Sequence, residues 1–107
     1  MANKQRGEVS IKLDRVRKLK FTTNAIAELE EALGCSISGM ENLDIGVKEM
    51  RKMFWASMLE EEPTLTFKEA GLLMDYGESY KYISEKVMEA LGIAFNDAND
   101  KKDTEKN

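Results

Sequence analysis

Residues 7–34, which read GEVSIKLDRVRKLKFTTNAIAELEEALG, decide the fold of this chain. In the first half of this stretch the apolar residues Val9 and Ile11 alternate with polar ones, and the alternation resumes at Leu19 and Phe21. A period of two indicates β-strands, and two short strands so close together indicate an antiparallel hairpin. Because a hairpin alone is marginally stable in water, its apolar face is expected to lie on the helices that follow.

The rest of the chain has helical spacing. Apolar residues recur at intervals of three and four in four segments: 24–33, 44–61, 67–76 and 79–91. The expected helix ends are marked by Gly34, Pro63, Gly77 and Gly92. Residues 35–43 are expected to connect the first two helices through one loose helical turn. The sequence therefore predicts an α+β fold, with an N-terminal β-hairpin followed by a bundle of about four α-helices.

The length of 107 residues suits one domain. Residues 8–95 are expected to form this single α+β domain. Residues 1–7 are polar and are interpreted as a flexible leader. Residues 96–107 contain almost only Asn, Asp, Lys and Glu, and this composition predicts a disordered polar tail.

The composition argues against most enzyme chemistry. There is no histidine, which removes the commonest general base and the commonest zinc ligand. The one cysteine, Cys35, follows a helix end and is interpreted as a buried or half-buried side chain without a reactive role. The acidic runs 28–31 and 60–62 are interpreted as solvated helix surface. We therefore expect no enzyme activity, no cofactor and no metal site.

The charge is divided unevenly along the chain, whose net charge is −4. Residues 1–20 hold seven Lys or Arg against two Asp or Glu, whereas residues 21–95 hold six basic and fourteen acidic residues. The acidic body is expected to repel nucleic acids and anionic lipids, and the basic residues of 1–20 are interpreted as a solvated hairpin face and leader. No apolar stretch approaches the roughly 20 residues that span a bilayer. We expect a cytoplasmic protein that binds neither membrane nor nucleic acid.

The helix predicted over 44–61 is apolar around more than half of its circumference, which is typical of a helix that is central or covered by a partner. Its stripe of Met50, Phe54 and Met58 is assigned to the core. Methionine repacks easily and suits surfaces that accept apolar partners. Four apolar residues of the chain point away from the predicted core stripes and are the candidate partner-binding residues: Met53, Trp55, Leu72 and Tyr82.

The order of these elements is similar to that of the tail assembly chaperone family of siphophages and gene transfer agents. The similarity is carried by the hairpin segments 7–13 and 18–21, the helix TTNAIAELEEALG at 22–34, and the helix start LTFKEAG at 65–71. Family members often have Asp-Gly in the hairpin turn, whereas this chain has Asp14-Arg15. Because Arg disfavours positive φ, a wider turn is expected here.

The resemblance implies a function in phage tail morphogenesis. Chaperones of this family bind the tape measure protein, the tail tube protein or both before the tube polymerises, and mask apolar surface until then. Two alternatives remain. The helices 67–76 and 79–91, joined at Gly77, could form a helix-turn-helix DNA-binding regulator, although the second helix balances its two lysines with glutamates. The chain could also be a minor structural tail protein.

Overall fold

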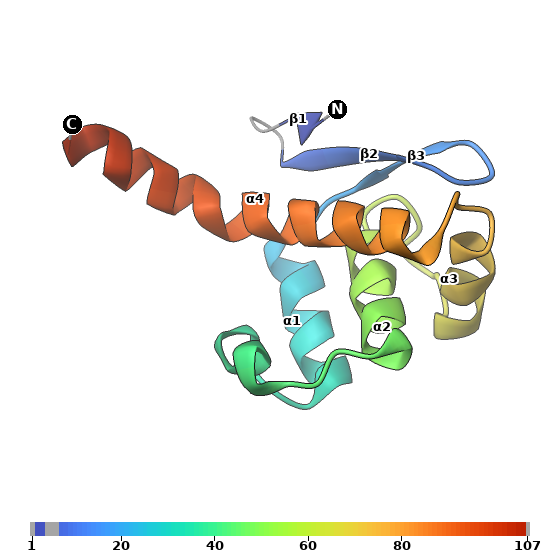
Figure 1. Ribbon diagram of the computed structural model, residues 1–107. Coiled ribbons are helices and arrows are strands. Elements are labelled where there is room, and N and C mark those ends of the chain that lie inside the picture. Colours follow the sequence, from blue (N-terminus) through green and yellow to red (C-terminus); the bar gives the residue numbers. More distant parts are fainter. Residues whose placement is uncertain (1, 4–6, 107) are drawn as a thin grey trace.

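The computed structural model of the protein describes residues 2–3 and 7–106, and it describes side chains over 7–40 and 43–95. A three-stranded antiparallel sheet, in the order β1-β2-β3, is followed by helices (Figure 1). The strands are β1 (Ala2–Asn3), β2 (Glu8–Lys12) and β3 (Val16–Leu19). The helices are α1 (Thr23–Leu33), the 3-10 helix η1 (Ile37–Asn42), α2 (Val47–Ser57), α3 (Phe67–Met74) and α4 (Tyr80–Lys106). The predicted α+β fold, with a hairpin before four α-helices, is confirmed.

The hairpin of β2 and β3 has the predicted face toward the core. Its register pairs Val9 with Leu19 and Ile11 with Arg17. Val9, Ile11 and Leu19 are buried, together with Leu13 and Phe21 beyond the strand ends. Three residues, Leu13–Arg15, separate the strands, so the turn is wider than a two-residue turn, as expected. No non-glycine residue in the described part of the chain has a positive φ.

The strand β1 is an addition to the predicted fold. Ala2 and Asn3 pair with Val9 and Glu8 of β2. These two residues belong to the segment interpreted as a flexible leader, and no regular structure was predicted there.

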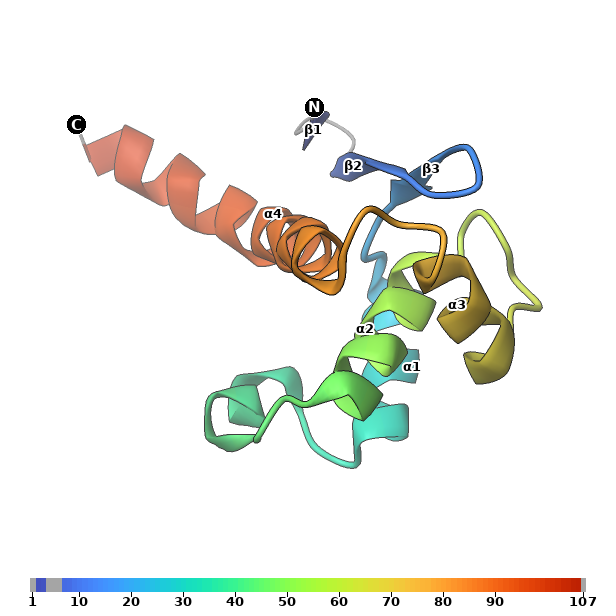
Figure 2. The same cartoon turned by 45° about the vertical axis from the view of Figure 1, so that its right-hand side comes forward.

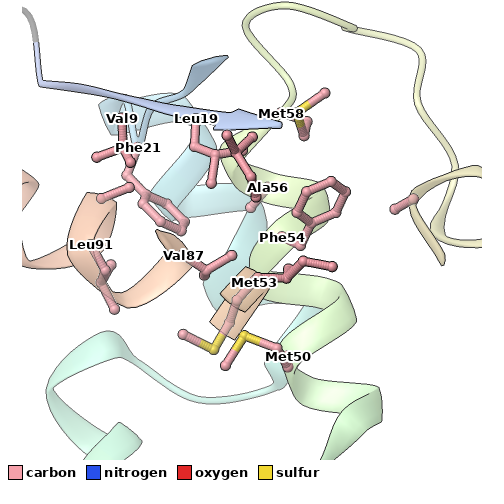
Figure 3. Close-up of a cluster of buried hydrophobic side chains, with 14 of the residues drawn as sticks. Val9, Leu19, Phe21, Met50, Met53, Phe54, Ala56, Met58, Val87 and Leu91 are labelled. Atoms are coloured by element: carbon pink, nitrogen blue, oxygen red, sulfur yellow. The ribbon is translucent and has the colours of Figure 1, made fainter. Parts of the chain in front are cut away.

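Helix α4 lies between the sheet and the other long helices. It passes beneath β2 and β3 and crosses above α1 and α2, and α3 stands beside α2 (Figures 1 and 2). The core forms where these layers meet. Val9, Leu19 and Phe21 come from the hairpin side, Met50, Met53, Phe54, Ala56 and Met58 from α2 and the turn after it, and Val87 and Leu91 from α4 (Figure 3). The prediction of a core stripe through Met50, Phe54 and Met58 is confirmed.

Several predicted helix ends follow from local hydrogen bonds. The Thr22 hydroxyl accepts from the Ala25 N–H at the start of α1, and Gly34 ends that helix with φ +78°. A capping box opens α3 within the segment LTFKEAG, where Glu69 N–H donates to Thr66 Oγ1 and Thr66 N–H donates to Glu69 Oε1. The loose turn expected between the first two helices is η1.

The bounds predicted for the second helix, 44–61, were wrong at both ends. Asp44 does not cap α2. Gly46 does, and its N–H donates to the Glu49 carboxylate at 2.9 Å. At the other end α2 stops at Ser57, well before Pro63. The reason is that the Ser57 carbonyl accepts from the Lys20 N–H beside β3, so the chain turns there toward the sheet.

The last helix extends past its predicted end. Gly92 was expected to terminate it, but α4 continues through Gly92 to Lys106. Gly92 has no positive φ and therefore makes no left-handed cap. The prediction of a disordered tail concerns residues 96–107. The side chains of these residues, and Asn107 as a whole, lie outside the described residues.

Candidate partner-binding surface

A groove of about 490 Å³ opens where the start of α2, the outer face of α3 and the start of α4 meet. We call it the α2–α3–α4 groove. The residues that line it include Val47, Arg51, Lys68, Leu72, Met74 and Tyr80. In Figures 1 and 2, α3 stands beside α2 near the first turn of α4, which places these three elements around one opening.

Three apolar side chains of the groove lining are exposed to solvent. Val47 is 65% exposed, Leu72 57% and Tyr80 45%. Each stands near a helix end or on an outer face, so no element of the described chain covers it. Clustered exposed apolar side chains of this kind mark contact surfaces on soluble proteins. Covering them would contribute roughly 25 cal/mol per Å² of apolar area removed from water.

Two cations stand in the same groove. Each lies four residues from an exposed apolar residue, Arg51 from Val47 on α2 and Lys68 from Leu72 on α3, so each pair shares one helix face. Neither cation takes part in a salt bridge with the side chains that the structure describes, whereas Asp75 supplies the single carboxylate of the lining. The groove is therefore apolar with an excess of positive charge, on a body that is otherwise acidic.

Arg51 is held in this position by close packing. A Cβ on Gly71 would come within 3.3 Å of Arg51 Cδ, so glycine allows the side-chain stem to lie against α3. Arg51 Nε is buried and has no hydrogen-bond partner among the described residues. Buried N–H groups are nearly always paired, so this one is an exception among the described residues.

The four residues predicted to bind a partner do not gather in one place. Met53 is fully buried in the core, at 0% exposure, and the interpretation of Met53 as a surface contact was wrong. The helix α2 is covered by α1 on one side and by α3 on another, so its surplus apolar face is interior. Leu72 alone lies in the groove.

Trp55 and Tyr82 are half-buried and make internal contacts. The Trp55 indole N–H donates to the Leu65 carbonyl at 2.7 Å. The Trp55 and Phe67 rings pack edge to face, with 4.8 Å between their centroids. The Tyr82 hydroxyl accepts from the Lys12 N–H at 2.9 Å, which ties α4 to β2. Both side chains hold elements of this chain together, and their predicted contact with a partner stays a prediction.

The sequence did not identify the other groove residues. Val47 and Tyr80 are not distinguished from core residues by the sequence, because each continues a helical period of three and four. Both stand in the first turn of their helices, where the stripe runs past the edge of the core. One signal was available in the sequence. Lys68 and Leu72 lie four residues apart and so share one face of a short helix, whose other face supplies the core contacts.

A second charged cluster lies at the hairpin turn. Arg17 is buried, at 7% exposure, so the interpretation that all the basic residues of 1–20 are solvated was wrong for this one. Its guanidinium binds Asp14, Glu61 and Glu62. These contacts hold the pKa of Asp14 below its ordinary value, chiefly through the hydrogen bond from Arg17, and raise the pKa of Arg17.

This cluster also accounts for much of the acidic run 60–62. Glu61 and Glu62 bind Arg17, and Glu61 Oε1 accepts from the Lys18 N–H on the free edge of β3. Among the residues that the structure describes, no three potential metal-ligating side chains of His, Cys, Asp or Glu come together. The run therefore connects the hairpin to the segment after α2.

Comparisons of the chain with protein-family models, with curated proteins and with solved structures found no match. Within the described residues, none of the helices combines the length and the apolar character needed to cross a bilayer.

Proposed function

We propose that this chain is a non-enzymatic tail assembly chaperone of the bacteriophage or prophage type. It binds the tape measure protein, the tail tube protein or both in the host cytoplasm during tail morphogenesis. The assignment to tails rests on the resemblance of the hairpin and helix segments to that family. The observation that supports a protein-binding function is the α2–α3–α4 groove, with Val47, Leu72 and Tyr80 exposed around one opening.

A chaperone of this kind needs apolar surface that is available without unfolding. The groove meets this need because its exposed residues lie on helices whose other faces are packed, with Met50 and Phe54 buried on α2 and Ala70 buried on α3. Contact with a client therefore need not disturb the core. The bound client would have its apolar residues shielded from aggregation until the tube forms around it.

The DNA-binding alternative has less support. A helix-turn-helix unit needs two helices that pack on each other, but α3 packs mainly on α2, and α4 packs on the sheet and α2. The outer face of α4 pairs Lys81 with Glu85 and Lys86 with Glu89, which leaves no excess of positive charge for phosphates.

Co-expression tests the proposal. The tagged chain is expressed with the tape measure protein or the tail tube protein encoded near it, and the soluble complexes are purified. We expect at least one of them to co-purify and to become more soluble. The matched pair of variants is Leu72→Ser, in the groove, and Val16→Ser, at the start of β3, where Val16 is similarly exposed at 59%. Comparing them separates binding in the groove from non-specific apolar binding. The proposal fails if neither protein binds the native chain.

A further inference from the structure

We propose that the α2–α3–α4 groove takes an amphipathic α-helix whose apolar stripe is flanked by Asp or Glu, and that Arg51 and Lys68 bind those carboxylates. This proposal rests on the proposed function, because it describes the segment of a client that the chain holds. It adds the chemistry by which the client is selected.

The charge of the groove supports an acidic occupant. Arg51 and Lys68 are two of only six basic residues among residues 21–95, which also hold fourteen acidic ones. An acidic segment would be repelled by most of this body and attracted to the groove, where neither Arg51 nor Lys68 forms a salt bridge with the described side chains.

The backbone around the groove supports a helical occupant. All three lining elements are helices, so none presents a free strand edge to which an extended segment could add. The exposed edge of β3 lies elsewhere and is already occupied, because the Lys18 N–H binds Glu61 and the Lys20 N–H binds the Ser57 carbonyl. A helix satisfies its own backbone and needs only side-chain contacts, which Val47, Leu72 and Tyr80 offer.

The C-terminal end of the chain's own last helix does not reach the groove. Tyr80 opens α4 at the groove, and the helix then runs away from it, so that the C-terminal end lies at the far side of the molecule (Figure 1). At 1.5 Å per residue, a helix of 27 residues carries its end about 40 Å away. The C-terminal end of α4 is therefore not the occupant of the groove.

Designed peptides test the chemistry directly. Three dye-labelled peptides of about 18 residues share one leucine stripe and differ only in the flanking residues, which are Glu, Gln or Lys. Binding to the full chain is followed by fluorescence anisotropy. We expect the Glu peptide to bind about ten-fold more tightly than the Gln peptide, the difference that one charge-assisted hydrogen bond gives, and the Lys peptide to bind most weakly. Equal affinities for the Glu and Gln peptides would overturn the proposal.

Variants then locate the effect. Arg51→Met keeps the stem that packs on Gly71, and Lys68→Met changes an exposed residue that the fold does not need. Each should remove most of the preference for Glu over Gln, whereas Lys81→Met, which removes an exposed cation of α4 outside the groove lining, should leave it unchanged. A preference that survives both groove variants contradicts the proposal, as do amide chemical-shift changes that avoid Val47, Leu72 and Tyr80 in NMR spectra.

The remaining outcomes separate this proposal from the proposed function. If a tail protein co-purifies but Arg51→Met and Lys68→Met bind it as the native chain does, the chaperone function stands and the acidic-helix proposal is wrong. If the Glu peptide binds as expected but no tail protein does, the groove chemistry stands and the tail assignment is wrong. Sedimentation velocity provides the last check. If the native chain is a dimer and the Leu72→Ser variant is a monomer, a second copy of the chain fills the groove and the acidic-helix proposal is wrong.

Discussion

The guanidinium of Arg17 lies 2.8 Å from the carboxylate of Asp14, measured from Nη2 to Oδ2, on the buried face of the hairpin. The same guanidinium donates from Nη1 to Glu62 at 3.0 Å and to Glu61 at 3.3 Å. One cation thus joins the hairpin turn to the segment that leaves α2. Because the four charges come from two parts of the chain far apart in sequence, they fix how the sheet sits on the helices.

Replacing Arg17 by Met should lower the free energy of unfolding by about 1–3 kcal/mol. The loss arises because three carboxylates lose their shared cation, and it is moderated because those carboxylates are partly exposed to water. Urea unfolding followed by circular dichroism measures it. Arg15→Met is the matched control. Arg15 is exposed and makes a single salt bridge, to Glu61 at 3.3 Å, so a change of no more than about 0.5 kcal/mol is expected. Equal losses in the two variants would contradict this account.

The same contacts make stability depend on pH. The hydrogen bond from Arg17 lowers the pKa of Asp14 below its ordinary value of 3.8. A carboxyl whose pKa is lowered on folding adds stability that is fully present above the unfolded pKa and is lost as the pH falls through the folded pKa. We therefore expect the native chain to lose stability below about pH 4 and Asp14→Asn to lose less over that range. An NMR titration should show the Asp14 pKa rising toward its ordinary value in Arg17→Met, and rising much less in Arg15→Met.

The α+β fold could be predicted because its signals are local. The alternation of Val9 and Ile11, the threonine cap at Thr22 and the glycine at Gly34 each depend on residues within a few positions. The end of α2 could not be predicted, because it depends on a bond between the Ser57 carbonyl and the Lys20 N–H, 37 residues apart in sequence. Arg17 is two residues from Leu19, so the same alternation places it inward. A charged residue is buried only where oppositely charged partners are available, and here Glu61 and Glu62 come from a segment distant in sequence.

The candidate site was less accessible to sequence reasoning than the fold. A surplus of apolar residues was visible, but periodicity alone cannot tell which side of an apolar helix faces another helix. Met53 was assigned to the surface and is in the core, whereas Val47 has the helical spacing of the core stripe and is exposed. The two differ in this way because α2 is covered along its middle and uncovered at its first turn, which depends on where α1 and α3 lie.

Gly77 is a further position where packing, rather than backbone freedom, sets the residue. A Cβ there would lie 2.6 Å from Ile83 Cδ1 and 3.3 Å from Leu13 Cδ2, two buried side chains from α4 and the hairpin turn. Gly77→Ala should therefore cost about 1–3 kcal/mol of unfolding free energy, as overpacking of a core does. Gly39→Ala is the control, since its Cβ would meet only Ser36 Oγ, at 3.6 Å. The thermal midpoints of the two variants, compared with that of the native chain, decide the matter, and an unchanged midpoint for Gly77→Ala would contradict the packing argument.

Met53 and Leu72 offer the sharpest comparison between core and surface. Met53 is fully buried among the core residues of Figure 3, and truncation to Ala would leave a cavity that costs about 2–5 kcal/mol. Leu72 is 57% exposed on the outer face of α3, and Leu72→Ala should change stability by no more than about 0.5 kcal/mol, because alanine also favours the helix. Client binding should show the opposite order. The Leu72→Ala variant should lose it, whereas the Met53→Ala variant should retain it at temperatures below the unfolding temperature of that variant. Denaturant unfolding of the two variants ranks their stabilities, and co-purification with the client ranks their binding. A large stability loss from Leu72→Ala would mean that this residue supports the fold, and the groove would then lose one of its three exposed contacts.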